Sequence, residues 1–318
     1  MRCFSGVATA FLLAFAAGGA LAGPDGPPDN RPVRAGRANQ PDDWRLSAGS
    51  LVYESPGRDR VNIHRYDAGA AAPVRLTTHR ARDQRPRWSP DGSKVAFHSD
   101  LAGSNDIYVI ERDGSNLRRI TDHPGQDTDP DWMPDGRLVF SSDRDGDENI
   151  YLLNLESGRL IQVTHYSGGR TGGPTAAGDG RRIAFSSDRL FSWQVYVLDL
   201  GNGEIKRITG PLPGKCNPAW SPREDRIAFM SGGDLIGTDL RSARPDGSGT
   251  RSIGSGVSNN EDPQYSENGR RLVWVSDRDG NWEIYEADAD GSGERRVSRT
   301  AADERHPDLF LGSPAGRD

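Results

Sequence analysis

The stretch Pro86-Arg-Trp-Ser-Pro-Asp-Gly-Ser-Lys-Val-Ala-Phe-His-Ser-Asp100 decides the fold, because close copies of it recur along the chain. The second copy begins Pro130-Asp-Trp-Met-Pro-Asp-Gly136 and continues with Leu138-Val-Phe-Ser-Ser-Asp-Arg144. A fixed period of roughly 40–45 residues, with strand patterns inside each unit, is the sequence signature of a β-propeller. The prolines that open the copies are spaced by 44 or 45 residues: Pro86, Pro130, Pro174, Pro218, Pro263 and Pro307.

Each unit contains four short runs of β-branched and aromatic residues, bounded by Gly, Pro, Asp and Asn, and this pattern predicts four strands. In the first complete unit the second run is Val95-Ala-Phe97, the third contains Ile107-Tyr108, and the fourth ends at Ile120. Pairs such as Asp91-Gly92 and Asn268-Gly269 suit the tight turns between strands, because they accept positive φ.

Five complete units occupy residues 83–298, and a sixth is split between the two ends of the repeat region. Residues 50–77 match only the second, third and fourth strands, whereas Glu304-Arg-His-Pro307-Asp-Leu-Phe310 matches the missing first strand. We expect this C-terminal strand to join the N-terminal three, because closing the ring hides the strand edges. The sequence therefore predicts an all-β, six-bladed β-propeller of four-stranded antiparallel blades over residues 44–311.

The ends of the chain have a different composition. Residues 1–22 read as a signal peptide: Arg2 supplies the charge, residues 7–17 are apolar, and Ala20-Leu-Ala22 is a cleavage motif. An uncleaved membrane anchor is the alternative reading of this short apolar stretch. Residues 23–43 and 312–318 are poor in apolar side chains and are expected to form a disordered leader and a flexible tail. We therefore expect a periplasmic or secreted protein that is not inserted in a membrane after signal cleavage.

Composition and motifs argue against several classes of function. The net charge is −6 and no basic stripe is present, so nucleic acid is not an expected partner. The chain lacks Gly-x-Ser-x-Gly, Gly-x-Gly-x-x-Gly, Cys-x-x-Cys and His-Glu-x-x-His motifs, which weighs against an α/β-hydrolase, a nucleotide enzyme and a zinc protease. We expect a non-enzyme that needs no cofactor.

One segment could bind a metal ion. The spaced carboxylates of Asp143, Asp145 and Asp147 around Gly146 are of a kind that can wrap Ca²⁺. The glycine is at the fourth position rather than the sixth position of an EF-hand loop, however, and turns favour these residue types without any metal. A hairpin turn is therefore the preferred interpretation, and Ca²⁺ the weaker one.

The polar residues just before the repeat prolines form the main candidate site. In a propeller the first strand of each blade is innermost, so its start lines the mouth of the central channel, and the loops after the second strands surround this mouth. Blade three contributes only Gly172-Gly173 and leaves a gap. We expect a net acidic rim that binds a polar or cationic ligand or a peptide; alternatively, these charges only solvate and cap the strand ends. The candidates are Asp83, Arg85, Asp127, Asp129, Asn217, Asp262, Glu304 and His306 at the strand starts, and Arg144, Arg189 and Arg278 in the loops.

The recurring Trp-Ser-Pro-Asp-Gly-x-x-x-Ala-Phe-x-Ser-Asp, followed by Asp/Glu-Ile-Tyr, resembles the PD40 or WD40-like repeat of TolB-family propellers. The clearest copies are Trp88–Tyr108, Trp132–Tyr151 and Tyr265–Tyr285, and the resemblance covers residues 50–310. It implies a monomeric periplasmic module that binds a protein or peptide of the cell envelope at its channel mouth. The same repeats occur in oligogalacturonate-lyase-like enzymes, so a metal-dependent propeller that binds or cleaves carbohydrate is the alternative.

Overall fold

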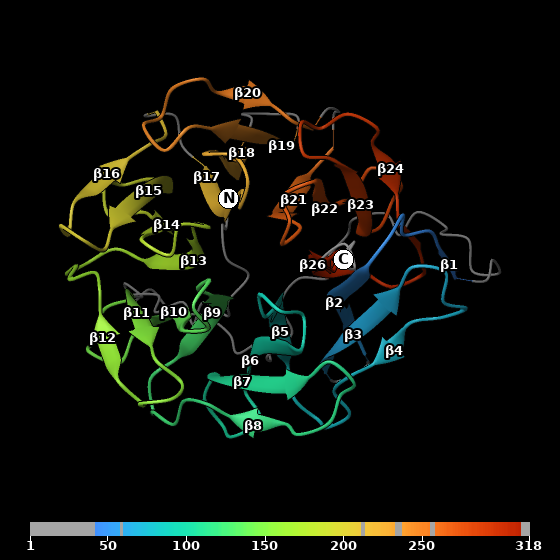
Figure 1. The fold of residues 1–318 in the computed structure, drawn as a ribbon, viewed down its shortest axis with the longest axis horizontal. Coiled ribbons are helices and arrows are strands. Elements are labelled where there is room, and N and C mark those ends of the chain that lie inside the picture. Colours follow the sequence, from blue (N-terminus) through green and yellow to red (C-terminus); the bar gives the residue numbers. More distant parts are fainter. Residues whose placement is uncertain (1–41, 58–59, 211–213, 233–236, 255–257, 313–318) are drawn as a thin grey trace, which may run out of the picture.

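A computed structural model describes residues 42–57, 60–210, 214–232, 237–254 and 258–312. In this part of the chain, six four-stranded antiparallel sheets are arranged as blades around a central axis (Figure 1). This arrangement confirms the predicted six-bladed β-propeller. The expected signal peptide, leader residues 23–41 and tail residues 313–318 lie outside the described residues. None of the described residues belongs to a helix long and apolar enough to cross a membrane.

Within each blade the strands follow one another from the channel outward, and only blade six combines strands from both ends of the repeat region. From the innermost strand outward, blade one consists of β5 (Asp83–Trp88), β6 (Lys94–Ser99), β7 (Asp106–Glu111) and β8 (Arg118–Arg119), and blade two of β9 (Asp127–Trp132), β10 (Leu138–Ser142), β11 (Asn149–Leu153) and β12 (Leu160–Gln162). Blade three consists of β13 (Thr171–Ala176), β14 (Arg182–Ser187), β15 (Gln194–Asp199) and β16 (Ile205–Arg207), and blade four of β17 (Lys215–Trp220), β18 (Ile227–Gly232), β19 (Thr238–Ala243) and β20 (Arg251–Ser252). Blade five consists of β21 (Asn260–Tyr265), β22 (Arg271–Ser276), β23 (Glu283–Asp288) and β24 (Arg295–Arg296), and blade six of β26 (Arg305–Phe310), β2 (Ser50–Pro56), β3 (Val61–Asp67) and β4 (Val74–Arg75).

A bulge in every innermost strand explains the recurring proline. In blade one, Gln84 pairs with His98 but Arg87 pairs with Ala96, so Arg85 and Pro86 are left out of the regular ladder. The same register shift occurs in the other five innermost strands. A bulge is a place where a strand accepts a residue without an N–H group. The residue before each proline has a left-handed backbone, with φ between 46° and 59°: Arg85, Asp129, Gly173, Asn217, Asp262 and His306.

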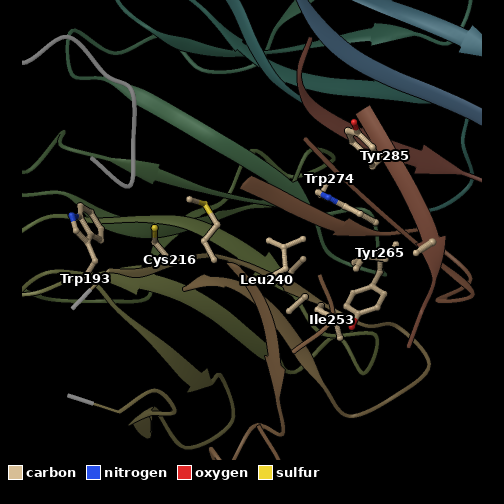
Figure 2. Packing of buried hydrophobic residues seen from close by; sticks show 12 residues of the cluster. Trp193, Cys216, Leu240, Ile253, Tyr265, Trp274 and Tyr285 are labelled. Carbon is tan, nitrogen blue, oxygen red and sulfur yellow. The ribbon is translucent and has the colours of Figure 1, made fainter. Parts of the chain in front are cut away.

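The hydrophobic core is divided into layers between neighbouring blades. Figure 2 shows the layer between blades four and five, where Leu240 and Ile253 of blade four lie near Tyr265, Trp274 and Tyr285 of blade five. Both faces of each second strand are therefore apolar, because each blade is packed between two others. The burial of these side chains is the main stabilising term of the ring.

The C-terminal strand closes the ring as predicted. β26 pairs antiparallel with β2, and the register places Leu309 opposite Leu51. Asp308 also accepts a hydrogen bond of 2.7 Å from the backbone N–H of Trp88 in blade one. Outside the blades, β1 (Asp43–Trp44) pairs with β25 (Ser298–Arg299), so the chain just before the first blade strand is attached to blade five.

Candidate functional site in the central channel

The six left-handed residues of the innermost strands lie around the central channel and are called the bulge ring here. They are Arg85, Asp129, Gly173, Asn217, Asp262 and His306, in blade order. The innermost strands that carry them surround the centre of the molecule in Figure 1. Non-glycine residues with positive φ are uncommon and cost energy, so their repetition at one level of the channel points to a functional arrangement.

Arg85 links three blades across the channel. Its Nε lies 3.0 Å from Asp129 Oδ1 in blade two, and its Nη1 lies 3.6 Å from Asp262 Oδ1 in blade five. The Arg85 side chain is only 9% exposed. Although burial by itself lowers the pKa of a guanidinium, the charges of Asp129 and Asp262 raise the pKa of Arg85. The channel therefore holds a permanent positive charge between carboxylates from different blades.

His306 lies between two buried carboxylates. Its Nδ1 is 2.6 Å from Glu54 Oε1, and its Nε2 is 3.1 Å from Asp262 Oδ2. Burial by itself raises the pKa of both carboxyls, but the charges of His306 and Arg85 lower the pKa of Glu54 and of Asp262 below their ordinary values. Both carboxylates are therefore ionised at neutral pH.

Blade four supplies an amide to the ring, and blade three supplies no side chain. The Asn217 amide Nδ2 donates a hydrogen bond to Asp262 Oδ1. Its Oδ1 is buried and has no hydrogen-bond partner among the described residues. Blade three supplies Gly173 at the equivalent position, and a glycine places no side chain in the channel. The ring thus has five side chains and one open position.

A cavity of about 390 Å³ lies beside the bulge ring on the side of blades four, five, six and one. This volume is within the usual range for sites that hold small ligands or single side chains. Acidic side chains outnumber basic ones in its lining: Glu54, Glu261, Asp262 and Asp303 face Arg85 and Arg305. Arg305 Nη1 lies 2.9 Å from Glu261 Oε2 and offsets part of this charge.

The three predicted acidic residues at the starts of the innermost strands are held by contacts outside the bulge ring. Asp83 accepts a hydrogen bond of 2.6 Å from Ser99, and both oxygens of Asp127 accept bonds of 2.8 Å from one guanidinium nitrogen of Arg144. Glu304 accepts a bond of 3.0 Å from Thr300 Oγ1. Burial, which outweighs this hydrogen bond, raises the pKa of Glu304 to about 8, so Glu304 contributes little negative charge to the rim at neutral pH.

The three predicted loop arginines are also engaged inside their blades. Each lies over the ring of the tyrosine that follows in the third strand: Arg144 is 5.0 Å from the centroid of Tyr151, Arg189 is 4.7 Å from Tyr196, and Arg278 is 4.4 Å from Tyr285. These contacts are cation–π interactions. Of the eleven predicted site residues, the structure therefore brings together Arg85, Asp129, Asn217, Asp262 and His306, whereas the other six make separate contacts outside this group.

The three carboxylates of the proposed Ca²⁺ loop make separate contacts. Asp143 accepts a hydrogen bond from the backbone N–H of Gln126, Asp145 from the Tyr151 hydroxyl, and Asp147 from the backbone N–H of Gly168. Among the described residues, no group of three or more His, Cys, Asp or Glu side chains is arranged to hold a metal ion.

Sequence reasoning overlooked the second strands, which supply Glu54 and His98 to the site. Glu54 accepts a 2.5 Å hydrogen bond from the backbone N–H of Arg85, and His98 Nδ1 accepts one of 3.1 Å from the backbone N–H of Asp129. The Ser186 hydroxyl oxygen likewise accepts a hydrogen bond of 3.2 Å from the backbone N–H of Asn217. A polar residue just before the last serine of an apolar strand is the signal that identifies this position. Burial lowers the pKa of His98 to about 4, so His98 is neutral and can accept this bond.

One loop on the same face carries exposed apolar side chains. Ser187 pairs with Thr171 at the start of β13, so the loop between β14 and β15 lies beside the channel mouth. In this loop Phe191 is fully exposed, and Leu190 is half exposed. Phe191 has a φ of 70°, at a position where blade two has Gly146 with a φ of 100°.

Comparisons with known proteins agree with this architecture. The family model described as PD40, TolB beta propeller domain, matches residues 55–168 and 121–242. The Tol-Pal system protein TolB of Francisella tularensis subsp. mediasiatica (strain FSC147) is 33% identical over 116 residues, which are 36% of this chain and 27% of that protein. The chain thus matches about a quarter of the length of this curated relative.

Solved structures extend the similarity in fold over most of the chain. TolB from Acinetobacter baumannii superposes with a TM-score of 0.71 at 23% identity, over 83% of this chain and 67% of that one. An oligogalacturonate lyase in complex with manganese superposes with a TM-score of 0.54 at 20% identity, over 80% of this chain and 76% of that one. At these identities the likeness shows the fold alone. The two family matches together span more than half of the sequence, and the chain therefore belongs to the TolB β-propeller (PD40) family.

Proposed function

We propose that this protein is a non-catalytic propeller of the periplasm that binds a segment of a protein partner at the mouth of its central channel. The observation that carries the proposal is the bulge ring, in which charged side chains from four blades meet beside an acidic cavity. Buried charges that are held in strained backbone positions are expensive for a fold that needs them only for packing. A binding site explains why the fold keeps these buried charges, because they would then contact the partner.

The loop with Leu190 and Phe191 supports a protein as the partner. An exposed phenylalanine in a left-handed conformation costs stability and buries no surface in the isolated protein. Aromatic side chains are among the residues that contribute most to protein interfaces. The loop lies beside the channel mouth, so a partner that inserts a segment into the channel would also cover Phe191. The TolB name of the relatives is consistent with a partner in the cell envelope.

Affinity capture from the envelope fraction of the host tests this proposal. The bait is the tagged protein, and the test variant is Asp129→Arg/Asp262→Arg, which reverses two charges of the bulge ring. The matched control is Asp113→Arg/Asp290→Arg, which reverses two exposed charges in the loops after β7 and β23, on the opposite face. We expect one protein to be captured by the wild type and the control and to be lost from the test variant.

Folding must be checked separately, because Asp262 is buried. The milder variant Asp129→Asn/Asp262→Asn keeps the side-chain shapes and removes the charges, and circular dichroism melts show whether either variant is folded. Capture of the same partner by a folded channel variant would contradict the proposed function. A rise in melting temperature of the wild type with Mn²⁺, together with loss of an oligogalacturonate substrate, would instead favour the carbohydrate-cleaving alternative.

A further inference from the structure

The chain enters the propeller beside the mouth of the channel. β1 pairs antiparallel with β25, which places Asp43 opposite Arg299 and Trp44 opposite Ser298. In an antiparallel pair, the chain read backward from one strand runs in the same direction as the chain read forward from the other. Residues 300–304 lead forward from β25 to β26, the innermost strand of blade six. The residues before Asp43 are therefore directed toward the start of β26 at the channel mouth.

Contacts with blade six fix this entry point. The indole of Trp44 packs against Tyr53 and Tyr66, with ring centroids 4.8 Å and 5.1 Å apart, and the Tyr66 hydroxyl donates a hydrogen bond of 3.0 Å to the Trp44 carbonyl. Burial is the main reason why the pKa of Glu304 is raised to about 8, and the charge of Asp42 adds to this increase of the pKa. Asp42, the first described residue, therefore lies near Glu304 at the channel mouth.

The acidic part of the cavity begins next to this entry point. Asp303 and Arg305, the neighbours of Glu304 in the sequence, both line the cavity, and Arg305 Nη1 lies 2.9 Å from Glu261 Oε2. Asp303 is exposed, and the group from which it accepts a hydrogen bond is the neutral backbone N–H of Trp282, at 3.0 Å. A cation that arrives beside Glu304 therefore meets carboxylates at the edge of the cavity.

The wall of the cavity is acidic and keeps one acceptor unsatisfied. Its lining contains four carboxyl side chains against two arginines and one histidine. The Asn217 amide, which also lines the cavity, donates from Nδ2 to Asp262, whereas its Oδ1 has no hydrogen-bond partner among the described residues. Asn217 is only 6% exposed, and a native structure usually satisfies such a buried acceptor with a ligand or water. Both observations favour an occupant with positive charge and hydrogen-bond donors.

The segment just before Asp42 has this chemistry. Residues 30–41, called the basic leader here, contain an arginine at every third position (Arg31, Arg34 and Arg37) and no acidic residue. An extended chain covers up to about 3.5 Å per residue, so Arg37 can extend up to about 18 Å from Asp42. The arginines can therefore reach the edge of the cavity from the entry point without any change in the propeller.

We propose that the basic leader occupies the channel mouth of its own propeller, where its guanidinium groups pair with Asp303 and Glu261 at the edge of the acidic cavity. A guanidinium suits this position because it pairs with a carboxylate through two parallel hydrogen bonds. A segment tethered by a few residues meets its site at an effective concentration of about 1 mM, so a dissociation constant of about 0.1 mM keeps the site about nine-tenths occupied. The inference does not depend on the proposed function; where both hold, the partner segment must displace the basic leader.

A fluorescent peptide of residues 30–41 tests the inference directly. It is added to three proteins with a C-terminal tag: the wild type, the leader variant Arg31→Gln/Arg34→Gln/Arg37→Gln, and a control that neutralises three exposed arginines at the outer edges of blades one to three, Arg118→Gln/Arg159→Gln/Arg207→Gln. Fluorescence anisotropy gives the affinities. We expect the leader variant to bind the peptide at least tenfold more tightly than the wild type or the control, because its own leader no longer competes. Equal affinities of the three proteins, or no binding to the leader variant, would overturn the proposal.

Two acidic positions test the location. In the leader variant, Glu261→Gln/Asp303→Asn keeps the side-chain shapes and removes two charges of the cavity, whereas the control Asp113→Asn/Asp290→Asn removes two exposed charges on the opposite face. We expect the first pair of substitutions to weaken the peptide at least fivefold and the second pair to change its affinity less than twofold. Unchanged affinity in the folded Glu261→Gln/Asp303→Asn protein would mean that the peptide binds elsewhere and that the inference is wrong. If this protein does not fold, the comparison of the leader variant with the wild type still decides.

Photocrosslinking shows which copy of the chain the basic leader contacts. Val33→p-benzoyl-phenylalanine places the crosslinking group between two of the leader arginines of the purified protein. After irradiation and digestion, we expect crosslinks within one chain to residues of β2, β21 or β26, which line the cavity, and we expect them to be lost from the leader variant. A covalent dimer would place the basic leader on a second copy, and crosslinks to the outer strands would place it on another surface; either result would contradict the proposal.

The failure of this inference and the failure of the proposed function give different results. If partner capture requires Asp129 and Asp262 but the peptide does not bind the leader variant, the inference fails and the proposed function stands. If the peptide binds at the cavity and partner capture is unaffected by the channel variants, the inference stands and the proposed function fails. If both are correct, the leader variant should capture more partner than the wild type at the same concentration, and equal capture would show that the basic leader and the partner do not compete.

Discussion

Replacement of Glu304 by glutamine should make the stability of the propeller less dependent on pH. Glu304 is 3% exposed and lies just before β26, the strand that closes the ring. Its Oε1 accepts a hydrogen bond from Thr300, whereas Oε2 has no hydrogen-bond partner among the described residues. Burial, with a smaller effect from the charge of Glu283, raises its pKa from 4.5 to about 8.

The sign of the effect follows from this raised pKa. Between pH 4.5 and pH 8 the folded protein keeps the proton of Glu304 and the unfolded chain does not, so the free energy of unfolding falls as the pH rises through this window. A tenfold change in proton affinity is worth about 1.4 kcal/mol, so the upper limit is about 5 kcal/mol. We expect about 3 kcal/mol, because a buried site relaxes when it is ionised. Glutamine has the same shape and is neutral at every pH, so Glu304→Gln removes this loss.

Urea unfolding, followed by tryptophan fluorescence at about pH 5.5 and about pH 8.5, measures the effect. From the lower to the higher pH, the free energy of unfolding should fall by about 3 kcal/mol more in the wild type than in Glu304→Gln. Glu156→Gln, which changes an exposed carboxyl in the loop between β11 and β12, is the control and should behave like the wild type. Parallel losses in the wild type and Glu304→Gln would show that Glu304 is not protonated in the folded protein and would refute the reasoning.

Three further substitutions test the packing and the assignment of roles. Trp274→Ala removes a fully buried side chain from the layer between blades four and five and should lower the free energy of urea unfolding by about 3–5 kcal/mol; a loss below about 1 kcal/mol would contradict the packing. Arg144→Ala leaves the buried Asp127 carboxylate without its cation and should lower the free energy of unfolding by about 3 kcal/mol. Partner capture by the folded variant should be unchanged; loss of capture would show that Arg144 belongs to the binding site. Phe191→Gly relieves a left-handed backbone and should raise the free energy of unfolding by about 1 kcal/mol, while Gly146→Phe at the equivalent position should lower it by about 1–2 kcal/mol. A large loss of stability in Phe191→Gly would mean that the phenyl group of Phe191 is packed in the native protein.

The fold could be predicted from the sequence because the repeat leaves few alternatives. Six prolines at a nearly constant spacing mark six equivalent strands, and the structure shows the bulge that accommodates them. The split sixth unit could also be assigned, because Glu304–Phe310 has the same pattern as the other first strands and closes the ring on β2. The pairing of β1 with β25 could not be predicted, since two residues at the edge of a polar segment carry no periodic pattern.

The site could be predicted only in part. Spacing identified the residues before the prolines, but it could not show that the bulge turns Asp129 into the channel while Asp127, two positions earlier, pairs with Arg144 inside its blade. A regular strand would place both side chains on one face, and the left-handed residue breaks this rule. The role of Glu54 was hidden for a different reason: its partner is the backbone N–H of Arg85 in the next blade, and backbone partners leave no trace in a sequence.

Site-specific photocrosslinking tests the central claim most directly. Gln84 lies on β5 and lines the channel cavity, and Asp113 lies in an exposed loop at the opposite end of blade one. The protein is produced in its host with p-benzoyl-phenylalanine at one position or the other, irradiated, and purified under denaturing conditions. If a partner segment enters the channel, Gln84→p-benzoyl-phenylalanine should give one crosslinked protein, and the Asp113 variant should not. A crosslink from Asp113 with none from Gln84 would place the partner on the other face and contradict the account.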